Sequence, residues 1–181
     1  MDNHVTILSK PYWTMDVANY LVQHFIDQGQ PITNSLLLKI LYYAQADSLR
    51  KTGKPLFTDK IEKWGHGPIV PVVYSYFKSY GAAPIKEMQQ YVLTDENTAW
   101  TLIKPEERQL AKNDTNWLNK LADEIQVKFA KNSFDLVKLT QKEQIWLKDK
   151  PRIKAGNMHI YYTNQEIIDY YRDNANWHWN N

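Results

Sequence analysis

Apolar residues recur every three or four positions along much of the chain, which is the spacing that buries one face of an α-helix. The first predicted helix begins at a capping Thr14 or Asp16 and ends before Gly29. The last begins with a capping box formed by Thr163 and Glu166. In all, the pattern predicts helices over about 14–28, 36–51, 71–80, 105–129, 133–139 and 163–171, with Ser133 as the cap of the fifth.

The second predicted helix has a regular apolar stripe, formed by Leu37, Ile40, Leu41 and Ala44. Shorter β-prone runs predict a strand at 61–64 and a hairpin in which 91–94 and 99–103 flank a turn at 95–98. Short helices bury one stripe each, so they must share a common core. The predicted fold is mainly α, a compact single-domain helical bundle of six or seven short helices with a small β-hairpin element.

The helical pattern defines one domain, predicted to span residues 14–173. Residues 1–13 are interpreted as an N-terminal extension and residues 174–181 as an aromatic C-terminal tail. The tail carries Trp177 and Trp179, which either form an exposed anchor for a partner or fold back onto the core.

Composition narrows the chemistry that 181 residues can perform. The chain has no cysteine, which excludes disulfides, thiolate zinc sites and cysteine nucleophiles and fits a cytoplasmic localisation. No apolar run is long enough to span a bilayer, and the first residues do not resemble a signal peptide. A net charge of +2 does not indicate a nucleic-acid partner. The seven Trp and twelve Tyr suit cores and protein interfaces alike.

No motif of a catalytic or metal site is present, and the five His share no spacing. We therefore expect no enzymatic activity, no metal and no cofactor. His24 lies near the apolar face of the first helix and is interpreted as a packing residue. The basic run Lys148 to Lys154 could contact phosphates, but a solvated loop around Pro151 is the favoured interpretation. No helix-turn-helix with a basic recognition helix is evident.

A glycine- and proline-rich segment beginning at Trp64 is the most specific feature of the chain. Gly67 and its neighbour Gly65 permit positive φ or a close approach of two backbones, and Pro68 fixes the chain direction. Such a segment is rigid and holds its side chains at set angles. We expect His66 to be exposed, whereas Trp64 either pins the loop to the helices or takes part in binding.

Two blocks of the sequence, taken together, resemble the Panacea domain, the SocA-like antitoxin family of phages and bacteria. The first block runs from Leu38 to Gln45, continues with Pro55-Leu56-Phe57, and ends with the stretch from Trp64 to Lys78. The second contains Leu139-Thr140, Glu143 and Trp146, and the predicted helix at 164–171 is also similar to the family pattern. The resemblance covers about residues 15–172 in order.

Three positions depart from the family pattern. Lys63 stands where a small residue usually precedes the Trp, and Ile145 stands where a Pro usually precedes Trp146. Gln141 replaces a usual His, so any role of that His in the family does not transfer to this chain.

The resemblance implies a mostly α, non-catalytic antitoxin that neutralises a cognate toxin by direct binding. Ten residues of the similar segments are candidates for a role in binding or in the structure that supports it. The residues expected to bind the partner, or to support the loop that does, are Trp64, His66, Gly67, Pro68, Lys39, Tyr43 and Gln45. The residues assigned to the structural motif are Thr140, Glu143 and Trp146.

Two other functions remain open at this point. The chain could be a proteolytic adaptor that delivers a toxin to a chaperone-protease, or a phage accessory protein that binds a host target. A membrane partner is not expected, and nucleic acid is a less favoured partner than protein.

Overall fold

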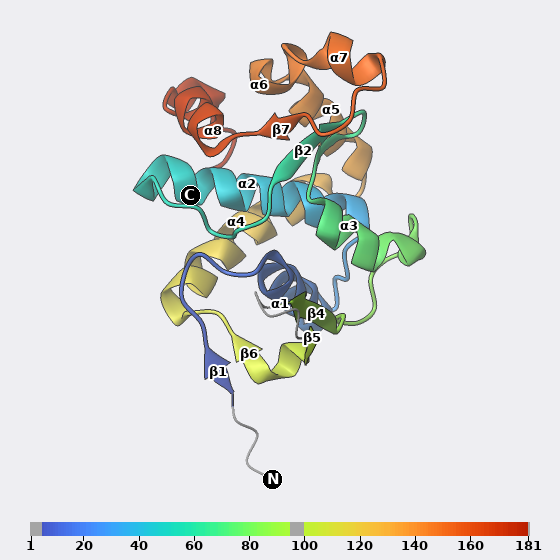
Figure 1. The fold of residues 1–181 in the computed structure, drawn as a ribbon, viewed down its shortest axis with the longest axis vertical. Helices are drawn as coiled ribbons and strands as arrows, with labels where there is room; N and C mark the ends of the chain where they lie inside the picture. Colours follow the sequence, from blue (N-terminus) through green and yellow to red (C-terminus); the bar gives the residue numbers. More distant parts are fainter. Residues whose placement is uncertain (1–4, 95–99, 181) are drawn as a thin grey trace.

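The computed structural model describes residues 5–94 and 100–180 and is mainly α-helical, as predicted (Figure 1). The helices of the described residues are α1 Thr14–Asp27, α2 Asn34–Thr52, α3 Pro71–Phe77, α4 Lys112–Phe129, α5 Ser133–Lys142, α6 Gln144–Leu147, α7 Lys150–Lys154 and α8 Asn164–Tyr171. The strands are β1 Thr6–Ile7, β2 Ile61–Trp64, β3 Gly67–Ile69, β4 Tyr91–Thr94, β5 Trp100–Ile103, β6 Arg108–Gln109 and β7 Tyr161–Tyr162.

Helix α2 is the centre of the fold, with α5 to α8 on one side of it and α1 on the other (Figure 1). It begins where the Thr33 side chain accepts a hydrogen bond from Leu36 N and ends at Gly53, which has a φ of +68°. Every residue from Leu36 to Leu49 is buried. The predicted apolar stripe was therefore too narrow, because other elements cover α2 on all sides and its polar side chains find buried partners.

Within the described residues, three small sheets complete the fold. The first has the strand order β3-β2-β7 and lies along α2, with both neighbours antiparallel to β2. In the second, β4 pairs antiparallel with β5, in a register that places Val92 opposite Leu102. The predicted turn of this pair, and Ala99 at the predicted start of its second strand, lie outside the described residues. The third sheet pairs β1 with β6 in parallel.

Several predicted boundaries were wrong. Pro105 opens a short 3₁₀ turn rather than a long helix, and β6 follows before α4 starts at Lys112. The reason is Arg108, whose guanidinium forms two hydrogen bonds to the Asp16 carboxylate, at 2.7 and 2.8 Å, and holds this stretch beside α1. The run Lys148 to Lys154 is also not a loop, because α7 lies within it.

Helix capping differs from the prediction at two further places. The N-cap of α1 is Trp13, while Thr14 instead donates a hydrogen bond of 2.5 Å to Asp59. The N-cap of α5 is Asn132 rather than Ser133, and neither cap position uses a side-chain hydrogen bond. The capping box of Thr163 and Glu166 is confirmed.

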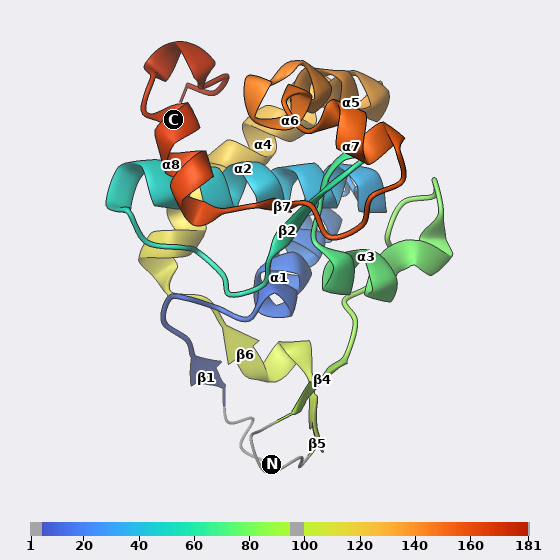
Figure 2. The same ribbon diagram turned by 45° about the horizontal axis from the view of Figure 1, so that its top comes forward.

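Residues near both ends of the described chain pack onto this core, although residues 5–7 are exposed. Tyr12 is 2% exposed and Trp179 is 5% exposed, and both belong to the same apolar cluster as the helices. The segment after α8 folds back toward α2 and α4 (Figure 2), where Trp179 packs edge-on against Tyr43. Its end is held by Asn180, whose backbone N–H donates to the Glu124 carboxylate. No described helix has the length and hydropathy that crossing a bilayer requires.

Candidate protein-binding site

The turn between β2 and β3 projects from one end of the sheet and carries the glycine- and proline-rich motif. Trp64 pairs with Gly67 across the turn, and Gly65 and His66 form its apex, where both are exposed. Gly67 has a φ of +89° and is buried. A Cβ atom at this position would collide with the Thr140 hydroxyl and lie 3.2 Å from Cε of Lys39. The positive φ and the close contact both explain why glycine stands here.

Lys39 supports the turn from below. Its side chain is 1% exposed and its ammonium donates a hydrogen bond of 3.2 Å to the carbonyl of Pro68. Burial lowers the pKa of Lys39 to about 7, because the charged form loses its hydration. The aliphatic part of the lysine therefore packs against β3. Its nitrogen donates to the carbonyl of Pro68, in a strand at the edge of its sheet.

Helices α5 and α6 support the turn from the side. Gln141 Nε2 donates to the carbonyl of Gly65 at 2.6 Å, and Trp146 Nε1 donates to the carbonyl of Trp64 at 3.1 Å. Gln141 stands where the family pattern has a His. In this chain its side-chain amide is the donor that reaches the apex of the turn. Together with Thr140 against Gly67, these contacts fix the backbone of the turn from 64 to 68.

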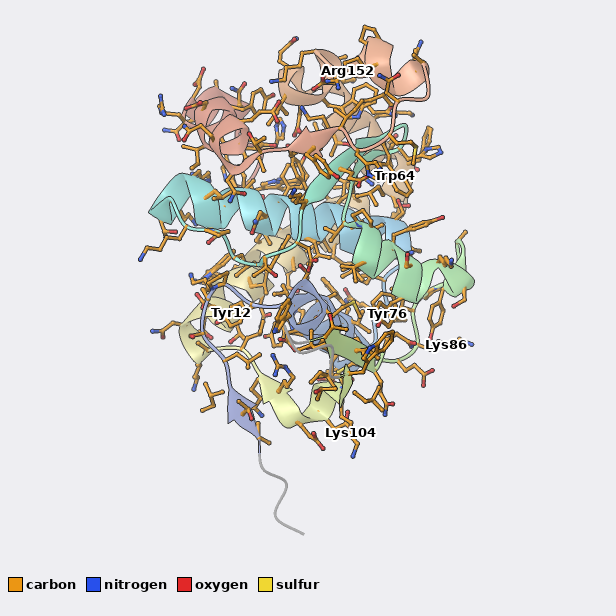
Figure 3. All side chains as sticks on the ribbon, viewed as in Figure 1. Tyr12, Trp64, Tyr76, Lys86, Lys104 and Arg152 are labelled. Carbon is orange, nitrogen blue, oxygen red and sulfur yellow. The ribbon has the colours of Figure 1, made fainter. Side chains whose placement is uncertain are left out.

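The Trp64 side chain lies at the surface end of this arrangement (Figure 3). Its ring is partly buried, packs edge-on against Tyr74 of α3 with centroids 5.4 Å apart, and donates a hydrogen bond of 2.7 Å to Glu62. Trp64 thus pins the turn to α3, as one of the two interpretations of the sequence predicted, and part of its ring stays exposed. The His66 side chain is exposed and forms no hydrogen bond or ion pair within the described residues.

The region that contains the turn matches a known protein family. The model of the family described as Antitoxin SocA-like, Panacea domain, matches residues 37–147, which is more than half of the chain. The chain belongs to this family. Antitoxin SocA of Caulobacter vibrioides (strain NA1000 / CB15N) is 40% identical over 65 residues, which are 36% of this chain and 35% of that protein. The chain thus spans about a third of the curated relative that it matches. No solved structure matches the chain significantly.

The Panacea region contains the whole turn and its supports. Residues 37–147 run from α2 to α6 and include Lys39, Thr140 and Trp146, while β7, α8 and the tail lie outside the matched range. Gln45 is also buried, but it supports a different segment: its side chain accepts from the backbone N–H groups of Leu56 and Phe57 and donates to the carbonyl of Phe57. It therefore anchors the chain between α2 and β2.

Glu143 is the polar centre of the structural motif. Its carboxylate is buried and accepts hydrogen bonds from Tyr42 at 3.0 Å, Tyr43 at 2.7 Å and Tyr171 at 2.9 Å. Burial and the nearby carboxylate raise the pKa of all three tyrosines well above the ordinary value, so they stay neutral donors. Tyr43 is therefore not a surface residue. It links α2 to α8 and the α5–α6 junction through Glu143.

Lys63 was noted in the sequence only as a departure from the family pattern, yet it ties three elements together. Its ammonium is buried and lies 2.7 Å from Asp149, 2.6 Å from Glu166 and 2.8 Å from the carbonyl of Ile145. The partners come from the α6–α7 junction and α8, so no local sequence signal reveals the cluster. The lysine fixes β2 against these helices directly behind the turn.

The polar side chains that support the turn are directed at protein groups, while the apex of the turn is exposed. Within residues 5–94 and 100–180 no group of His, Asp and Glu side chains could hold a metal ion. The buried Lys39, Glu143 and Lys63 all face protein groups. What reaches the surface is the apex at His66 and the edge of Trp64, mounted on a backbone that is hydrogen-bonded from several sides.

Proposed function

We propose that this protein is the antitoxin of a toxin–antitoxin pair and that it neutralises its toxin by direct binding. Its membership of a family named for an antitoxin supports the role, and so does its similarity to Antitoxin SocA. The mechanism that we propose is occlusion, in which the surface around the β2–β3 turn covers the active site of the toxin or locks it in an inactive conformation.

The observation that carries the proposal is the rigid mounting of an exposed turn. Hydrogen bonds from Lys39, Gln141 and Trp146 hold three of its backbone carbonyls, while His66 stays exposed at the apex. Binding is favoured when little conformational entropy is lost on association, so a fixed turn is suited to recognition. A protein that only needed to close a chain reversal would not require three side chains from other elements, two of them buried, to hold it.

The test is growth of cells that express an open reading frame adjacent to the gene, with and without this protein, followed by co-purification. Toxicity that is relieved together with a stable complex supports direct neutralisation. Relief without a complex, accompanied by falling toxin levels, would replace binding with delivery to a protease. Absence of any toxicity would contradict the antitoxin role.

A further inference from the structure

A groove of about 320 Å³ lies beside the β2–β3 turn, between Trp64 on one side and the segment that joins α7 to β7 on the other. Ile153 and Met158 supply apolar walls, and Met158 is 69% exposed. In Figure 3, Trp64 lies below the helix that carries Arg152, which places the groove between β2 and α7. A methionine exposed in this way is a flexible apolar contact with no packing role in the fold.

One buried carboxylate holds both walls of the groove. Glu62 is 6% exposed and accepts the indole N–H of Trp64 at 2.7 Å, and its other oxygen lies 3.0 Å from Nδ1 of His159. His159 has a φ of +59°, a conformation that non-glycine residues seldom adopt. The opposite walls are therefore fixed to one another through Glu62, so the groove is preformed and does not depend on a bound partner.

Apart from the buried Glu62, the charged residues near the groove are mainly basic. Between Lys138 and His159 the sequence has six basic side chains and two carboxylates, whereas the net charge of the whole chain is only +2. Glu143 is buried in its own network, and Asp149 is paired with Lys63 and Arg152. The basic collar, defined as Lys142, Lys150 and Lys154, forms no ion pair within the described residues.

The collar and the groove are parts of one surface. Lys150 and Lys154 belong to α7, which also provides Ile153 to the groove wall. Lys142 follows Gln141 in α5, and the Gln141 side chain donates a hydrogen bond to the carbonyl of Gly65 at the apex of the turn. An apolar centre surrounded by charged residues is the usual anatomy of a protein-binding site. A phosphate backbone would satisfy the lysines but would leave Met158 and Ile153 without a complementary group.

We propose that the groove receives an acidic segment of the partner that inserts an apolar side chain between Trp64 and Met158, with its carboxylates paired to the basic collar. The proposal rests on the proposed function in taking the toxin as the partner. It adds which chemistry of the toxin is recognised, and it extends the binding surface from the turn to α7 and the α7–β7 segment.

Two short fluorescein-labelled peptides test the recognition directly. Both carry a central Leu-Phe pair, flanked by Asp and Glu in one peptide and by Lys in the other, and binding to the full-length protein is measured by fluorescence anisotropy. The acidic peptide is expected to bind at least about tenfold more tightly, with an affinity that falls as salt is raised. Equal binding of the two peptides, or no binding of either, would overturn the proposal. So would tighter binding of a duplex oligonucleotide than of the acidic peptide.

Variants with matched controls locate the site. Met158→Ser and the double variant Lys150→Glu/Lys154→Glu should each weaken the acidic peptide about tenfold. Val127→Ser removes an equally exposed apolar side chain from α4, and Lys112→Glu/Lys120→Glu makes the same change of net charge on that helix; both should bind normally. Equal effects of test and control variants would show that the peptide does not occupy the groove.

The same variants separate this inference from the antitoxin role. If the wild-type protein relieves toxicity and the groove variants relieve it equally well, the groove proposal fails while the proposed function stands. If the acidic peptide binds in the groove but the protein protects no cell from any adjacent gene product, the antitoxin role fails while the recognition chemistry stands.

Discussion

Replacing Gly67 with alanine perturbs the turn at its tightest point. The φ of +89° strains any residue with a Cβ, at a cost of about 1–2 kcal/mol. The new methyl group would also meet the Thr140 hydroxyl and approach Cε of Lys39 to 3.2 Å, and overpacking of this kind costs about 1–3 kcal/mol. We therefore expect Gly67→Ala to lower the free energy of unfolding by about 2–5 kcal/mol.

Urea unfolding followed by circular dichroism measures this loss. At a slope of about 2 kcal/mol per M, the midpoint should fall by about 1–2.5 M. Gly65→Ala is the matched control, because Gly65 has no positive φ and no atom would lie within 4 Å of its added Cβ. That variant should stay within about 0.5 kcal/mol of the wild type.

A double-mutant cycle separates strain from collision. Thr140→Ala removes the hydroxyl that the new methyl group meets, so Gly67→Ala should cost less in the Thr140→Ala background, by about 1–3 kcal/mol. The part of the stability loss that comes from the positive φ of residue 67 should persist in the Thr140→Ala background. Strictly additive effects of the two substitutions would refute the close contact, and a Gly67→Ala variant as stable as Gly65→Ala would refute the whole description of the turn.

Three further predictions concern buried and exposed groups of the site. The pKa of Lys39 is about 7 in the folded protein and 10.5 in the unfolded chain. Between these pH values the unfolded state binds more protons, so the free energy of unfolding should rise as the pH is raised above 7. The gain is about 1.5 kcal/mol by pH ~8.5, before unfolded tyrosines ionise. Lys39→Met should abolish it in pH-dependent urea titrations, and an unchanged slope would show that the lysine is hydrated. Glu143→Ala removes the carboxylate that accepts from three buried tyrosine hydroxyls, so the free energy of unfolding should fall by about 3–5 kcal/mol in thermal unfolding. A fall of less than about 1 kcal/mol would contradict the network. His66→Ala should leave stability within about 0.5 kcal/mol and weaken toxin binding in calorimetry, whereas equal losses of both would place His66 in the core.

The helices could be predicted because their signals are local. Thr163 and Glu166 are three residues apart and form the predicted capping box, and α2 and its stop at Gly53 follow from a continuous apolar pattern. The stretch after Pro105 was mistaken for helix because its conformation depends on Asp16, which lies far away in the sequence. A single-sequence pattern carries no information about such a pairing.

The candidate site was predictable only in outline. The glycines and prolines indicated a rigid turn, and Gly67 does have positive φ against a close neighbour. The sequence could not show that Tyr43 and Gln45 are buried in separate networks, since their partners Glu143 and Phe57 become neighbours only through folding. Glu62, which fixes Trp64 and His159 together, was missed because a carboxylate within a short strand usually faces solvent.

The central claim, that the β2–β3 turn is the surface that neutralises a toxin, is tested most directly by hydrogen–deuterium exchange on the purified antitoxin–toxin complex. Protection on binding should be concentrated at residues 64–66 and extend to 153–159, with little change along the exposed face of α4. Protection confined to α4 or to the β4–β5 pair, with exchange at 64–66 the same in the free and bound protein, would contradict the account.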